Sequence, residues 1–158
     1  MVRFEPAPDR RSILGHLYWF LSWVFVVVVA LWLRPSHFGH GTHQQLGLPP
    51  CPSVLLYGRP CPGCGLTTSF THVAHGNFAM AFQTHPLGPL LFLAWGVTAL
   101  MCLYGFVRKK RFITDTPGFN RGMVATAWVF FLFGAVRFAA IDYRSENPVA
   151  WLHQVTSR

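Results

Sequence analysis

The sequence predicts an all-α membrane protein: three transmembrane helices, with a Cys-rich interfacial helical hairpin between the first and the second. Apolar residues make up 52% of the chain and charged residues only 11%, whereas soluble domains carry about 25% charged residues. Three apolar runs are long enough to cross the hydrocarbon core of a bilayer. A Pro-, Gly-, Cys- and His-rich segment separates the first two runs. We expect residues 1–158 to form a single membrane domain.

The predicted spans cover about residues 13–33, 87–107 and 122–141. The first run exceeds the roughly 7–15 apolar residues of a signal-peptide core and ends without a small-residue cleavage site, so we expect a retained helix. Arg137 falls in the last turns of the third span. We expect its side chain to reach the interface or to pair with an acid such as Asp142.

The distribution of basic residues predicts the orientation in the membrane. The N-terminal tail carries three Lys or Arg residues and the loop between the second and third spans carries five, including Arg108–Arg111. The opposite side carries four in all. By the positive-inside rule, we expect a multi-pass membrane protein with a cytoplasmic N-terminus, which in a bacterium would lie in the inner membrane. The Cys-rich outer loop, residues 34–86, and the C-terminus would then be periplasmic or extracellular.

The sharpest local signal is the run Cys61-Pro62-Gly63-Cys64-Gly65. Two thiols three positions apart can bind one metal ion, form a disulfide or exchange with another disulfide. The glycine after the second cysteine can adopt a positive φ, which allows the loop to turn its N–H groups toward the sulfur atoms. Cys51 supplies a third thiol upstream.

Two short helices are expected after this run. Residues 66–74 form the first, with Thr67 and Thr68 available as caps. A His-Gly-Asn turn at residues 75–77 ends it. Phe78, Ala81 and Phe82 then indicate a second helix that stops at His85-Pro86. Both helices are too short and too polar to span, so we expect them to lie in the membrane interface.

The same segment resembles the bacterial domain-of-unknown-function 2752 family. The resemblance rests on Cys51-Pro52, Cys61-Pro62-Gly63-Cys64-Gly65-Leu66-Thr67, His75-Gly76-Asn77 and His85-Pro86-Leu87, in that order. It implies a small membrane-embedded protein and supplies no catalytic mechanism. The sequence departs from the family pattern at three places: Thr68 stands where Arg is usual, Asn77 where Asp is frequent, and His85 where Asn is usual.

Several functions remain open for the cysteines. In one, Cys51, Cys61 and Cys64 form a structural staple, either through a disulfide or by binding zinc. Three thiols do not pair evenly, which favours a metal with a histidine as fourth ligand, or one disulfide with one free thiol. We prefer His75 as that ligand because it belongs to the family-like turn, and His72 is the alternative.

Two other functions would use the same thiols chemically. Cys61 and Cys64 could act as a membrane thiol-disulfide oxidoreductase, with Cys51 as the resolving thiol. A redox or catalytic metal centre could instead combine the cysteines with the three histidines of the preceding loop, His37, His40 and His43. In a last interpretation, the cysteines serve only packing.

Other function classes find no support in the sequence. The chain has five acidic residues, none in the Cys segment, and it lacks phosphate-binding glycine loops, HExxH and GxSxG motifs. Its basic residues flank apolar runs, so nucleic-acid binding is not expected. We therefore favour a role without catalysis, as an accessory or structural subunit. Its partners would be the lipid bilayer and other membrane subunits.

Overall fold

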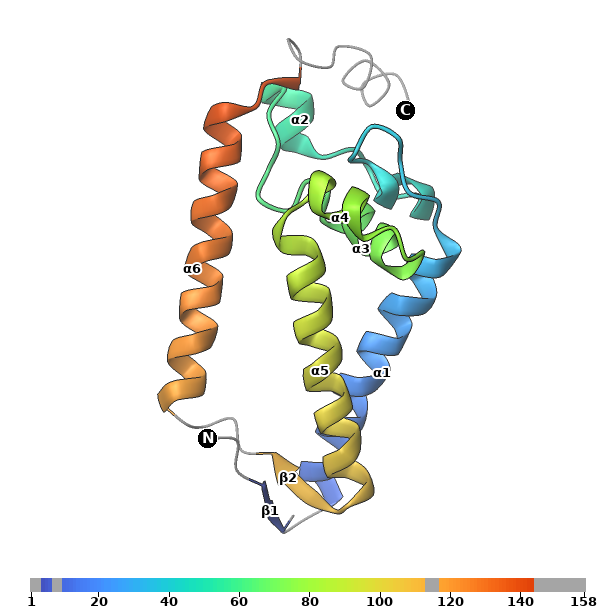
Figure 1. Ribbon diagram of the computed structural model, residues 1–158, viewed down its shortest axis with the longest axis vertical. Coiled ribbons are helices and arrows are strands. Elements are labelled where there is room, and N and C mark those ends of the chain that lie inside the picture. Colours follow the sequence, from blue (N-terminus) through green and yellow to red (C-terminus); the bar gives the residue numbers. More distant parts are fainter. Residues whose placement is uncertain (1–3, 7–9, 113–116, 144–158) are drawn as a thin grey trace.

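The computed structural model describes residues 4–6, 10–112 and 117–143. This part of the chain is helical apart from a two-stranded sheet (Figure 1). Its elements are β1 (Phe4–Pro6), α1 (Arg10–Trp32), the 3-10 helix η1 (Thr42–Leu46), α2 (Pro52–Tyr57), α3 (Leu66–Ala74), α4 (Phe78–Thr84), α5 (Leu87–Val107), β2 (Lys110–Phe112) and α6 (Pro117–Ala140).

Three of these helices are long and apolar enough to cross a membrane: Ile13–Trp32, Leu87–Val107 and Pro117–Ala140. The predicted fold class is therefore confirmed, and the cysteine cluster lies between the first two of these helices. The third begins at Pro117 rather than at residue 122. Proline suits the first helical position because its missing N–H needs no partner there.

Helices α1 and α5 pack against each other and separate toward the ends that adjoin α3 and α4 (Figure 1). The indole Nε1 of Trp19 donates a hydrogen bond of 3.1 Å to Thr98 Oγ1. Trp23 lies directly over Gly96, where a Cβ atom would come within 3.2 Å of the indole ring. A small residue in one helix thus makes room for a large aromatic residue in the other.

Residues 34–86, here called the cap, cover one end of this helix pair (Figure 1). Within the cap, α3 and α4 form a tight hairpin in which Ser69 Oγ donates a hydrogen bond of 2.9 Å to the Ala81 carbonyl. A small apolar core joins the hairpin to the spans; its buried members are Val73, Ala81 and Phe92. The bounds predicted for the first hairpin helix are those of α3.

Helix α6 stands apart from α5 over its N-terminal half and meets the cap near its C-terminal end (Figure 1). At that end Gly134 lies against Pro62, so closely that a Cβ atom on Gly134 would clash with the proline ring. Arg59 donates hydrogen bonds to the carbonyls of Phe138 and Ala139. The Tyr143 N–H donates to the Gly58 carbonyl at 2.8 Å. The cap therefore connects α6 to the rest of the molecule.

Strands β1 and β2 pair antiparallel at the opposite end of the molecule from the cap, with Glu5 opposite Arg111 (Figure 1). This sheet joins the N-terminal segment to the basic loop that follows α5. The two regions predicted to share the cytoplasmic side therefore lie together.

Candidate metal centre

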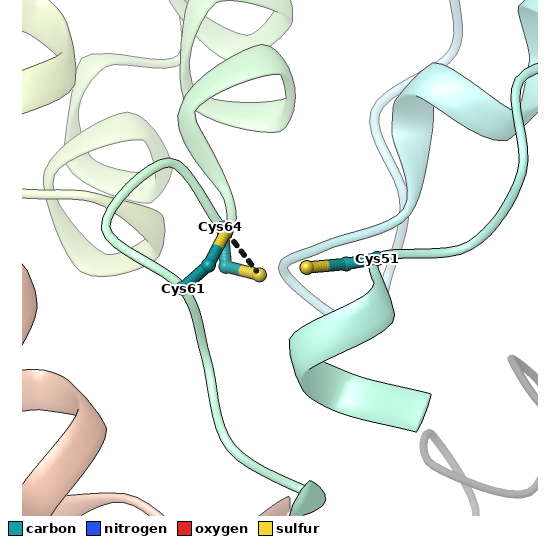
Figure 2. Close-up of side chains that lie close together, drawn as sticks. All are labelled: Cys51, Cys61 and Cys64. Atoms are coloured by element: carbon teal, nitrogen blue, oxygen red, sulfur yellow. Dashed lines mark hydrogen bonds between the residues drawn. The ribbon is translucent and has the colours of Figure 1, made fainter. Parts of the chain in front are cut away.

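The three cysteines of the cap converge on one point (Figure 2). The Sγ atoms of Cys51, Cys61 and Cys64 all lie within 4.8 Å of one another. The sulfur atoms of Cys61 and Cys64 lie 3.3 Å apart. Cys51 faces this pair from the start of α2 (Figure 2). Cys64 is buried, whereas Cys51 and Cys61 are half-buried.

Local backbone structure places each thiol. Pro52 occupies the first position of α2, so Cys51 is the residue that caps the helix, and its carbonyl accepts the N–H of Leu55 at 3.0 Å. Between the other two thiols the chain makes a tight turn, closed by a 3.0 Å hydrogen bond from the Cys64 N–H to the Cys61 carbonyl. This turn brings thiols three positions apart onto one side, as the sequence predicts for a metal-binding knuckle.

Gly65 allows the turn to continue into α3. Its φ is +85°, in the left-handed region that glycine adopts without steric cost. A Cβ atom there would also lie 2.9 Å from the Gly39 carbonyl oxygen and 3.1 Å from that of Thr84. Gly65 is the residue before α3, and no side chain caps this helix. Thr68, expected as a possible cap, instead lies buried with its Oγ1 2.7 Å from Thr42 Oγ1.

The three thiols influence one another's protonation. Hydrogen bonds from Cys61 and Cys64, and then from the N–H groups of Val54 and Ser53, lower the pKa of Cys51. The contact with Cys51 raises the pKa of Cys61 and, together with burial, that of Cys64. The pKa values of the three thiols therefore depend on one another. A cation at this point would favour deprotonation of all three.

Beside the thiols lies a cavity of about 270 Å³. Its lining joins the three cysteines to His40 in the loop before η1, to His43 within η1, and to the first turn of α3. His40 is 3% exposed, and its ring stacks on Tyr143 with 4.5 Å between the ring centroids. His43 Nε2 lies 3.2 Å from the Pro49 carbonyl.

The preferred ligand from the sequence, His75, takes a different place in the structure. Its Nε2 lies 3.1 Å from the carbonyl of Leu33, where it joins the end of α3 to the end of α1. Neither His75 nor His72 is among the described residues that line the cavity. Of the histidines in the preceding loop, His40 and His43 line it and His37 does not. Sequence reasoning therefore identified the thiols but favoured a histidine outside the cavity.

Arg137 provides a positive charge next to the cluster. Its guanidinium donates a hydrogen bond of 2.9 Å to the Cys64 carbonyl and also lies 3.5 Å from the Thr84 carbonyl. From the sequence, we expected the Arg137 side chain to reach the membrane interface or to pair with an acid. Its contacts with these backbone carbonyls were not predicted. These two contacts connect the last turn of α6 to the backbone beside the cluster.

The comparison with protein families agrees with this geometry. Residues 51–99 match the model of a family described as protein of unknown function (DUF2752). The DUF2752 resemblance is confirmed. The matched segment contains all three clustered cysteines, the hairpin of α3 and α4, and most of α5. No curated protein and no solved structure matches the chain. What the DUF2752 segment does must therefore be argued from its own residues.

Proposed function

We propose that this DUF2752 protein is a small integral membrane protein whose cap is held together by one metal ion, zinc, bound to Cys51, Cys61 and Cys64. The protein would serve as an accessory or structural subunit of a larger membrane complex. The observation that carries the proposal is the convergence of three sulfur atoms within 4.8 Å.

The spacing of the sulfur atoms fits zinc. With Zn–S bonds of about 2.3 Å in a tetrahedron, two sulfur ligands lie about 3.8 Å apart. The separation of 3.3 Å between Cys61 and Cys64 and the limit of 4.8 Å for all pairs bracket that value. A disulfide would use two of the thiols and leave the third without a role, whereas a metal uses all three.

A structural role follows from what the three ligands connect. Cys51 begins α2, and the other two thiols occupy the turn before α3. One ion would therefore fix two short cap helices relative to each other. Short helices are unstable alone, so binding free energy at this point would act as folding free energy for the cap.

The membrane orientation and the subunit role rest on separate support. The cap would face the periplasm or the outside, and β1 with the basic loop the cytoplasm, according to the positive-inside rule. Outside the spans, the chain offers little mass for an independent catalytic domain. Helix α6 exposes large apolar side chains along its length, including Trp128, Phe131 and Val136. Lipid and a partner subunit would cover these side chains in a complex.

The deciding experiment is metal analysis of the full chain purified in mild detergent, combined with thiol counting. We expect about one zinc per chain, with three thiols that react only after chelation or denaturation. Cys102→Ser is the matched control, because this fourth cysteine lies in α5, away from the cluster. It should leave the zinc content unchanged, whereas Cys64→Ser should remove zinc.

The same preparation distinguishes the oxidoreductase alternative. If the chain were metal-free, and Cys61 and Cys64 cycled between dithiol and disulfide while a disulfide-containing partner was reduced, the oxidoreductase function would replace the structural proposal.

Native size provides a second criterion. Gentle solubilisation should retain the chain in a complex much larger than 17.8 kDa, and an isolated monomer would contradict the subunit role.

A further inference from the structure

We propose that Nε2 of His40 is the fourth ligand of the cysteine centre, so that the cap binds zinc through three thiolates and one imidazole. This inference rests on the metal centre proposed above and extends it by assigning the ligand that completes the tetrahedron.

The hydrogen bonding of His40 carries the argument. Its Nδ1 lies 2.7 Å from the Phe38 carbonyl. A carbonyl oxygen only accepts, so Nδ1 must hold the proton and Nε2 must present its lone pair. Nε2 is buried and meets no hydrogen-bond partner among the residues that the structure describes. Leaving a buried acceptor unsatisfied is unfavourable, and a metal ion would satisfy it.

A shared cavity brings His40 next to the thiols, although its ring nitrogens are not part of the group of ligand atoms that lie within 4.8 Å of one another. His40 lines the same cavity as Cys51, Cys61 and Cys64. Among the described residues, His72 and His85 also have a buried ring nitrogen without a hydrogen-bond partner, but neither lines the cavity, and neither does His75. His43 does line the cavity, but its Nε2 already lies 3.2 Å from the Pro49 carbonyl.

The surroundings of His40 match those of a metal-binding histidine. Such residues usually donate their second ring N–H to a carbonyl or carboxylate, which fixes the tautomer and the ring orientation. The Phe38 carbonyl fulfils this role, and Tyr143 stacks on the ring with an angle of 3° between the planes. Burial lowers the pKa of His40 below its ordinary value, which keeps the imidazole neutral and able to bind a metal.

The charge of the completed centre also fits its environment. Zinc with three thiolates and one neutral imidazole carries a net charge of −1. Arg137, bound to the Cys64 carbonyl, supplies the opposite charge. A buried or half-buried ion needs such a counter-charge to be stable.

Cobalt substitution of the detergent-purified full chain tests the assignment. Co²⁺ bound by three sulfur atoms and one nitrogen has visible and X-ray absorption spectra that differ from those of a four-sulfur site. We expect the parent protein to give the former. His40→Ala should weaken Co²⁺ and Zn²⁺ binding by at least the roughly 10–100-fold that loss of an outer-shell partner costs.

Three further variants make the result decisive. His40→Cys should restore tight binding and change the spectrum to that of four sulfur ligands, which also decides the matter if His40→Ala does not fold. His43→Ala, from the same cavity, and His75→Ala should retain the parent spectrum. An unchanged spectrum in His40→Cys, or loss of nitrogen in His43→Ala or His75→Ala instead, overturns the assignment of His40 alone. Absence of Co²⁺ and Zn²⁺ binding by the parent overturns the metal centre, and the fourth ligand with it.

Discussion

The guanidinium of Arg137 donates a 2.9 Å hydrogen bond to the carbonyl of Cys64, across 73 residues of chain. This contact links the end of α6 to the cysteine cluster. A hydrogen bond from a charged donor contributes more to stability than a neutral one. Loss of this contact should therefore affect the stability of the fold and the proposed metal binding.

Arg137→Ala should therefore lower the free energy of unfolding by about 1.5–3 kcal/mol, the range for hydrogen bonds to charged groups. It should also weaken zinc retention, because the thiolates lose a neighbouring cation. Thermal unfolding in detergent and zinc content after dialysis measure the two effects. Arg121→Ala, on the exposed first part of the same helix, is the control, and equal losses in both variants would contradict a specific role of Arg137.

The two glycines of the knuckle should respond differently to alanine. At Gly65 the positive φ and the nearby carbonyls of Gly39 and Thr84 oppose a Cβ atom, and we expect a loss of about 1–3 kcal/mol together with loss of zinc. At Gly63 a Cβ atom would meet nothing within 4 Å, so Gly63→Ala should behave nearly like the parent. Melting curves with parallel zinc analysis check the pair. A Gly63→Ala variant that is less stable than Gly65→Ala would refute the turn geometry.

The three clustered cysteines should act as a unit. Cys51→Ser and Cys64→Ser should each lower stability by a similar amount, because each breaks the same closure. For a disulfide the loss would be about 2–4 kcal/mol, and a metal site can lose more. The double variant should cost little beyond either single one. Additive losses in denaturant or thermal unfolding would mean that the residues act independently.

Acidification should destabilise the metal-free cap. Burial lowers the pKa of His40 in the folded chain below 6.5, so below that pH the unfolded chain binds more protons than the folded one. Stability is thus fully present above pH 6.5 and decreases as the pH falls through the lower, folded value. His40→Gln should give a shallower dependence of melting temperature on pH. Some dependence should persist from His72 and His85, whose pKa values burial also lowers. An unchanged slope would show that proton binding by His40 does not differ between the folded and the unfolded chain.

The orientation in the membrane can be tested with single cysteines. In a background without the native cysteines, Leu48→Cys in the cap and Lys109→Cys after α5 would be treated in intact cells with an impermeant thiol reagent. Leu48 is 51% exposed, so its replacement should be labelled, whereas the replacement of Lys109 should react only after lysis. The opposite pattern would invert the proposed topology.

Much of the fold could be predicted because its signals are local. Continuous apolar runs locate α1 and α5, and the turn at His75 and Gly76 bounds the hairpin helix between residues 66 and 74. The start of α6 was placed too late, since the polar residues before Gly122 outweighed the helix-start signal of Pro117. The pairing of β1 with β2 has only three residues on each side, too few for a pattern to emerge.

The site was only partly predictable for a related reason. The knuckle is encoded by adjacent residues, so its thiols could be read directly from the sequence. The role of His40 depends on a fold in which Gly65 lies against the carbonyl of Gly39 and Tyr143 returns from the far end of the chain. The flanking glycines argued against a helix in this loop, but no local pattern distinguishes His40 from its neighbours His37 and His43.

The position of Tyr143 has a consequence for how the protein is made. The arginine that contacts Cys64 lies in the last turn of α6, and the ring that covers His40 lies just after this helix. During synthesis all three thiols and His40 therefore leave the ribosome well before the residues that enclose them. At the proposed metal centre and in the proposed orientation, the ligands would be complete while still open to water, and the cap would capture an ion as it crosses the bilayer. Insertion of the third span would then seal the loaded site.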